Sequence, residues 1–216
     1  MSALLTAPKL VLSRKHNGMR MEPEEFDSIS VCNENWSYEL INGVLVVNPI
    51  PFALETGPNQ ELGYHLLRYR ETHPQGSCLD LTLPEQYVRT SKNRRRADRL
   101  IWTGLGRIPD WRTELPSIVT EFVSARSRDK YRDYVEKRAE YMELGIAQYW
   151  IIDRFRRIMT LVFRQRKAIV ENVIHEHEAI TSSLLPGFEL PLAQLLAVSD
   201  SMKAVMKKRR RTRKPE

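Results

Sequence analysis

Cysteine is scarce in this chain of 216 residues, which contains only Cys32 and Cys78. They stand in different predicted elements without metal-ligand spacing, so we interpret them as small buried residues rather than as a disulfide or a zinc site. Long apolar runs are missing too, since none approaches the ~20 residues of a membrane-spanning helix. The N-terminal apolar stretch contains Pro8 and has no basic residue ahead of it, which argues against secretion. We therefore expect a cytoplasmic protein with no membrane partner.

Glycine-rich phosphate loops are also missing. Gly104 and Gly106 lack the further glycine and the helix of a dinucleotide-binding motif, so they predict a turn. His175 and His177 alternate with acidic residues, a pattern more typical of an exposed edge strand than of a metal site. No internal repeat is visible. The hydrophobic content of 42% is enough for the core of one ordinary domain.

The net charge of +7 is concentrated at the C-terminus. From residue 199 to residue 216 there are eight basic and two acidic residues, whereas the rest of the chain holds 26 basic and 25 acidic residues. The basic residues are Lys203, Lys207, Lys208, Arg209, Arg210, Arg211, Arg213 and Lys214. We interpret 199–216 as a disordered basic tail. Such a tail attracts phosphate backbones without sequence preference, but it can equally be a solubilising end.

Hydrophobic periodicity and turn signals predict one folded domain over residues 21–198, preceded by an arm over 1–20. Asn42-Gly43 between two β-rich runs predicts a hairpin over 36–48. We expect helices over 22–30, 59–71, 128–144 and 192–198, and strands over 78–88, 97–102, 116–124, 147–153, 158–163 and 167–175. On the third of these helices we expect Val135, Ala139 and Met142 to form the buried stripe.

The strand–helix–strand order around the long helix predicts parallel pairing of the strands that contain Glu121 and Trp150. The 147–153 run is almost continuously apolar, as expected of a strand that is covered on both faces. These features predict an α/β (α+β) fold with one mixed sheet and flanking helices.

Two acidic residues stand in apolar strand sequences, Asp98 and Glu121. A buried carboxylate is costly unless a positive charge lies against it, and Lys137 follows on the next helix. Two such acids and a lysine suggest a divalent-metal site, with Glu39 as a further candidate ligand before the hairpin turn. Single acids near strand ends are also common structural features. Lys137 could equally be a helix-surface lysine paired with Asp133 or Tyr141.

The segment that precedes Asp98 is strongly basic. Lys92, Arg94, Arg95 and Arg96 fall in a predicted loop over residues 89–96. Such a loop can contact the phosphate backbone of DNA, and it can equally be an ordinary solvated loop.

Several segments, in order, resemble the Uma2 family of restriction-endonuclease-like proteins, which have the PD-(D/E)XK nuclease fold. They are the run 38–45 (YELINGVL), Arg96-x-Asp98, the run 119–124 (VTEFVS), the spaced residues Arg132, Asp133, Lys137, Tyr141 and Gly145, the run 149–153 (YWIID) and the run 185–190 (LPGFEL). The resemblance covers about residues 22–196.

The resemblance implies a restriction-endonuclease-like core and a Mg²⁺-dependent (or Mn²⁺-dependent) endonuclease that hydrolyses phosphodiester bonds in DNA. By position in the motifs, Asp98 and Glu121 would bind the metal, and Glu39 would assist as a ligand or position the water. Ala97 replaces the family's usual proline. Val123 stands where the wider fold has its lysine, so that role would pass to Lys137.

The alternative is a non-catalytic nucleic-acid-binding or interaction protein on the same fold, because fold alone does not fix function. Nucleases of this kind often act as homodimers, and a homodimer is therefore an expectation as well.

Overall fold

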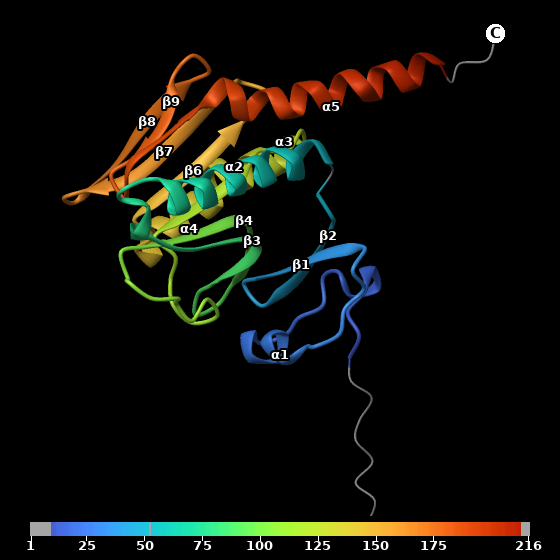
Figure 1. Cartoon of the computed structure of the whole chain (residues 1–216). Helices are drawn as coiled ribbons and strands as arrows, with labels where there is room; N and C mark the ends of the chain where they lie inside the picture. The colour runs from blue at the N-terminus through green and yellow to red at the C-terminus, as the bar shows by residue number, and fades with distance from the viewer. Residues whose placement is uncertain (1–9, 52, 213–216) are drawn as a thin grey trace, which may run out of the picture. The chain divides into compact units, whose positions relative to one another are not determined.

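The structure is a computed structural model that describes residues 10–51 and 53–212. The chain forms two compact units. The first comprises Met1–Ile50 and Tyr87–Arg96, and the second comprises Pro51–Gln86 and Ala97–Glu216. Figure 1 shows the course of the chain through both.

The first unit is built on the predicted hairpin, β1 (Trp36–Ile41) and β2 (Val44–Pro49). Asn42 and Gly43 both have positive φ, as a tight hairpin turn requires. The start of β4 (Arg94–Thr103) pairs with β1, Leu40 opposite Arg94. A short helix, α1 (Pro23–Ser28), begins with proline and two acids, as predicted from the sequence.

The predicted arm is wrong for the part of it that the structure describes. Residues 14–16 form a 3₁₀ turn, η1 (Arg14–His16). Leu12 is buried beside Tyr38, whose hydroxyl donates to the Leu12 carbonyl at 3.0 Å. Residues 1–9 lie outside the described range. Cys32 is exposed and Cys78 is half-buried, so the prediction that both are buried is also wrong.

The second unit contains a mainly antiparallel sheet in the order β4-β5-β6-β7-β8, with β3 paired to β4. A separate two-stranded sheet, β9 with β10, was not predicted from the sequence. The strands are β3 (Leu79–Arg89), β5 (Ile118–Phe122), β6 (Gln148–Asp153), β7 (Ile158–Gln165), β8 (Ala168–His175), β9 (Ala179–Ser182) and β10 (Leu185–Pro191). The predicted parallel pairing of β5 with β6 is confirmed, with Thr120 opposite Trp150.

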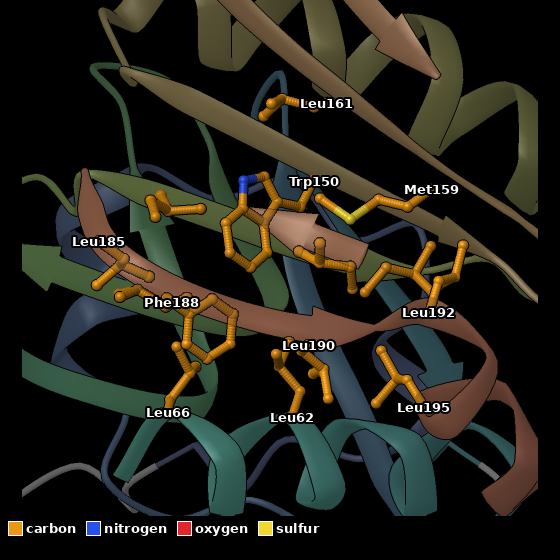
Figure 2. Close-up of a cluster of buried hydrophobic side chains, with 14 of the residues drawn as sticks. Leu62, Leu66, Trp150, Met159, Leu161, Leu185, Phe188, Leu190, Leu192 and Leu195 are labelled. Atoms are coloured by element: carbon orange, nitrogen blue, oxygen red, sulfur yellow. The ribbon is translucent and has the colours of Figure 1, made fainter. Parts of the chain in front are cut away.

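Two helices pack over one face of this sheet, α2 (Ala53–Thr72) and α5 (Leu192–Thr212). The apolar core lies between them and the strands, as Figure 2 shows. Its labelled members include Leu62, Leu66, Trp150, Phe188 and Leu192. Trp150 comes from the centre of β6, every residue of which is buried.

A helical segment with three consecutive parts joins β5 to β6. It consists of α3 (Ser127–Tyr131), the π-helical turn η3 (Arg132–Glu136) and α4 (Lys137–Leu144). Gly145 ends it with φ of 93°, the left-handed C-cap that the sequence predicts. The π-turn was not predicted, and it changes which residues face inward. Val135 is 46% exposed and Ala139 is also exposed, so their predicted places in the buried stripe are wrong, whereas Met142 is buried.

Two helix boundaries also differ from the sequence-based expectation. Helix α2 begins at Ala53 and contains Pro58 in its first turns, whereas the expected start was residue 59. Helix α5 continues to Thr212, so residues 199–212 are helical rather than a disordered tail. No helix in the described part of the chain is long and apolar enough to cross a membrane.

Candidate active site

Asp98 and Glu121 are brought together by the pairing of β4 with β5. The paired residues are Arg99 with Thr120, Leu100 with Val119 and Ile101 with Ile118, so one further step in this antiparallel register brings Asp98 opposite Glu121. Residues that face each other in this way have Cβ atoms about 5 Å apart and project from the same face of the sheet. Asp98 Oδ2 accepts a hydrogen bond from the Phe122 amide at 2.6 Å, which fixes the carboxylate beside β5.

Lys137 reaches this pair from α4. Its Nζ lies 2.7 Å from Glu121 Oε1, and only 2% of the residue is exposed. The alternative of a helix-surface lysine is therefore excluded. Tyr141, one turn later, donates its hydroxyl to the same Glu121 oxygen at 3.3 Å. Glu121 is thus held by an ammonium and a hydroxyl on one oxygen.

The π-turn determines which helix side chains face the site. Asp133, Lys137 and Tyr141 are all buried, at successive intervals of four residues. The Asp133 carboxylate lies 3.9 Å from Lys137 Nζ, and the Asp133 carbonyl accepts the hydroxyl of Tyr149 at 2.9 Å. π-Turns are frequent at functional sites, because the extra residue changes where neighbouring side chains point.

Burial controls the electrostatics of Asp98. Its pKa is raised from the ordinary 3.8 to about 7, mainly by removal from water and next by the negative charge of Glu85. Lys137 and the Phe122 amide act in the opposite direction, but the effect of burial is larger. Asp98 therefore changes protonation near neutral pH when no cation is bound.

Glu121 follows the same logic. Burial raises the pKa of its carboxyl well above the usual value, although Lys137 lowers it. The nearby Asp98 and Asp133 charges add to the rise. Burial likewise raises the pKa of the Tyr149 hydroxyl, and Glu121 contributes to that shift. An additional positive charge beside the pair would stabilise both carboxylates in the ionised form.

Glu39 belongs to the first unit, where it is 3% exposed on β1. Its Oε1 accepts the Arg96 amide at 3.1 Å, and its Oε2 accepts Asn48 Nδ2 at 3.3 Å. These contacts hold a buried carboxylate in place. Its role as a third ligand stays a prediction.

The basic loop that the sequence predicted does not exist as such. Arg94, Arg95 and Arg96 lie within β4, and the first two are only 7% and 3% exposed. Arg94 is bound to Asp27, with Nη2 2.7 Å from Oδ2. The prediction that Arg94 and Arg95 contact DNA is therefore wrong. Lys92 is exposed in the turn before the strand.

Three further residues of the site were not assigned a role from the sequence: Glu85, Asp133 and Tyr149. Tyr149 and Asp133 are part of the quoted motifs, and their spacing from Lys137 could have identified them. Glu85 carries a different signal, since it adopts φ of 54° inside β3, which is uncommon for a residue with a side chain.

Within residues 10–51 and 53–212, no group of three or more His, Cys, Asp or Glu side chains is gathered so that it could hold a metal ion. The site is therefore a pair of facing carboxylates with a lysine. Mg²⁺ sites often use one or two protein carboxylates, with water and substrate phosphate as the other ligands.

The second unit has a mixed α/β fold, in which helices flank the sheet and Asp98 and Glu121 lie on neighbouring strands. A solved structure supports this class: the crystal structure of a putative nuclease belonging to DUF820 from Anabaena variabilis. The two superpose with a TM-score of 0.64 at 14% sequence identity, over 83% of this chain and 99% of that one. At this identity the similarity shows the fold alone.

The family model of Uma2, described as "Putative restriction endonuclease", matches residues 23–193. The chain belongs to this family. No curated protein matches it.

Proposed function

We propose that this chain is a divalent-metal-dependent endonuclease that hydrolyses phosphodiester bonds in DNA. The observation that carries the proposal is the facing pair Asp98 and Glu121, with Lys137 Nζ 2.7 Å from one of the two carboxylates. Burial of Glu121 and partial burial of Asp98 cost stability, and a bound cation would offset that cost. Membership of a family described as "Putative restriction endonuclease" supports DNA as the substrate.

The residues fit a Mg²⁺ or Mn²⁺ ion by their chemistry. Mg²⁺ and Mn²⁺ both prefer carboxylate oxygens as ligands. In the described part of the chain, the hydrogen bonds of the pair involve Oδ2 of Asp98 and Oε1 of Glu121. Each carboxylate would therefore have an oxygen available, and Asp98 and Glu121 are the residues that would hold the ion. For Glu39, the role of a further ligand or of the residue that positions the water rests on the family resemblance alone.

When bound, such an ion neutralises charge on the phosphate and lowers the pKa of a coordinated water. The chain's own residues would supply the orientation. Lys137 is held by Glu121, and its ammonium can orient the attacking water or stabilise the charge that develops on the phosphate. Tyr141 fixes the same carboxylate from the next turn of the helix. Two copies of the chain would supply the two sites needed to cut both strands, which is the homodimer that we propose.

The test is plasmid nicking by the wild type and by Asp98→Asn, Glu121→Gln and Lys137→Met, in Mg²⁺, Mn²⁺ or EDTA. We expect each variant to lose about a hundredfold or more in rate, and EDTA to abolish nicking. Asp80→Asn is the matched control, since Asp80 is also a strand acid but accepts the Leu105 amide. Calorimetric titration with Mg²⁺ should show binding that Asp98→Asn weakens. Nicking that persists in EDTA or in Glu121→Gln would contradict the proposal.

A further inference from the structure

A basic and aromatic surface lies where β6 ends, and we call it the β6-turn surface. It consists of Lys130 and Tyr134 from the helical segment and of Arg154, Phe155 and Arg156 from the turn after β6. Arg156 is exposed, Phe155 is 41% exposed, and Lys130 and Arg154 are half-buried.

Aromatic rings hold the three cations of this surface close together. The Arg154 guanidinium lies 4.4 Å from the centre of the Phe155 ring, and Lys130 Nζ lies 4.9 Å from it. The Arg156 guanidinium lies 5.8 Å from the centre of the Tyr134 ring. Contacts of this kind restrict long side chains that would otherwise sample many rotamers, so less ordering is needed when a ligand binds.

The backbone beneath these side chains is fixed by Asp153. Its Oδ1 accepts the amides of Phe155 and Arg156 at 2.8 and 3.1 Å, and its Oδ2 accepts the Tyr134 hydroxyl at 3.2 Å. Asp153 is fully buried, so its charge is directed at the turn rather than at solvent. The turn and the helix are thereby tied to each other.

One of the three cations is paired with an acid, since Arg154 forms an ion pair with Glu55 at 3.9 Å and both side chains are largely buried. In the described part of the chain no ion pair involves Lys130 or Arg156, and the nearby Asp129 is engaged with Arg132 at 3.3 Å. Arg126 and Arg128 add two more exposed positive charges at the start of the same helical segment. The charge that this surface presents to solvent is therefore mainly positive.

This surface adjoins the carboxylate pair. The strands β5 and β6 are parallel, and Phe122 at the end of β5 lies opposite Ile152 near the end of β6. Glu121 and the β6 turn are therefore at the same edge of the sheet. Ligands of open α/β sheets bind at the carboxyl ends of parallel strands. The helix that carries Lys137 also carries Lys130 and Tyr134.

We propose that the β6-turn surface binds the phosphate backbone of DNA beside the carboxylate pair, with Lys130 and Arg156 as the contacting cations. The inference rests on the proposed function, because it identifies the surface that holds the DNA at that site. It takes the place of the predicted contacts from Arg94 and Arg95, which are buried.

The experiment measures binding of a short fluorescein-labelled DNA duplex by anisotropy, in EDTA so that no cleavage interferes. The double variant Lys130→Ala/Arg156→Ala is compared with the wild type over a range of salt concentrations. Arg112→Ala/Arg166→Ala is the matched control. It also removes two exposed positive charges, but from loops next to the amino ends of β5 and β6. All three proteins keep the same basic C-terminus.

Each backbone contact contributes about 0.9 to the slope of log K against log salt concentration. In the double variant we expect this slope to become shallower by the amount of about two contacts. The affinity for the duplex should fall about tenfold or more at low salt. The control should retain the wild-type slope. A wild-type slope in the double variant, or an equal loss in the control, would overturn the inference. Because binding is measured without metal, failure of nicking alone would overturn only the proposed catalysis.

Discussion

At the scale of single residues, the contact between Lys137 and Glu121 dominates the site. Both side chains are almost fully buried, and Nζ lies 2.7 Å from Oε1. A buried ion pair contributes little net stability compared with apolar packing, because both charges have left water. Removing one partner is strongly destabilising, because the other charge then stays buried without a counter-charge.

Lys137→Met should therefore destabilise the fold by about 3–5 kcal/mol. The matched control is Arg138→Met, at the next position on α4, because Arg138 pairs with Glu171 at the surface. An exposed pair of this kind contributes roughly 0–1 kcal/mol. Urea denaturation at pH 8 measures both. Equal losses would show that the Lys137 charge is not buried as described. The double variant Lys137→Met/Glu121→Gln should recover part of the loss, since no charge is left behind.

Asp98 gives the metal-free protein a pH-dependent stability. Its pKa is raised from 3.8 to about 7, so between these values the folded chain keeps a proton that the unfolded chain has lost. Stability should accordingly fall as pH rises from about 4 to about 7, by a few kcal/mol. Asp98→Asn should flatten this dependence in urea denaturation series. A slope that Asp98→Asn leaves unchanged would contradict the assignment to Asp98.

The same proton affects metal binding. At pH 8, Mg²⁺ should raise the Tm of the wild type, because it neutralises two ionised carboxylates. At pH 5 the protonated Asp98 should make that rise much smaller. Thermal denaturation with and without Mg²⁺ at both pH values checks this. In the control Asp98→Asn, Mg²⁺ should not raise the Tm at either pH.

At the scale of elements, the sequence allowed the strands and the crossover to be predicted better than the helix interior. The run 147–153 is apolar throughout and could only be a covered strand, and its parallel partner followed from the helix between them. The π-turn left no comparable signal. It moves Val135 outward and Asp133 inward, and an expected stripe of period 3.6 cannot accommodate one extra residue. The sequence pointed to Lys137 as the partner of the buried acids, but it left a helix-surface lysine as an equal alternative.

At the scale of elements, helix α2 lies so close to β4 at Gly63 that the Arg99 side chain fills the space beside the glycine. A Cβ there would lie 2.5 Å from Nη2 of Arg99, a buried guanidinium bound to Asn59 and Thr82. Gly63→Ala should cost about 1–3 kcal/mol despite the better helix propensity of alanine. At Gly57, the Cβ would meet the flexible end of Met202 instead. Gly57→Ala, the control in the same helix, should be close to neutral. Denaturant melts of both variants provide the comparison.

At the scale of the whole molecule, the sequence shows directly that the positive charge is concentrated after residue 199. It did not reveal that residues 199–212 are helical. The basic residues after 199 were expected in a disordered tail, because a run of like charges has no apolar face to bury. The preceding residues supply that face: Leu192, Leu195 and Leu196 are buried, and Ser199 Oγ donates to the Leu54 carbonyl at 2.9 Å. Once α5 has begun on this packing, it continues to Thr212.

Truncation after Met206 tests what the basic end contributes. It removes seven basic residues and one acid, which lowers the net charge from +7 to +1. The buried residues of α5 named above, from Leu192 to Ser199, precede the cut, so the Tm should not change. Affinity for a DNA duplex at low salt should fall at least about tenfold, and the salt slope should decrease, because a basic segment of this kind attracts DNA through its phosphates. Anisotropy titrations measure both quantities.

If the slope is unchanged, the C-terminus does not contact DNA, and backbone binding is left to the β6-turn surface. If it falls, combining the truncation with Lys130→Ala/Arg156→Ala should lower it further, because the two contacts act on different phosphates and their effects should add.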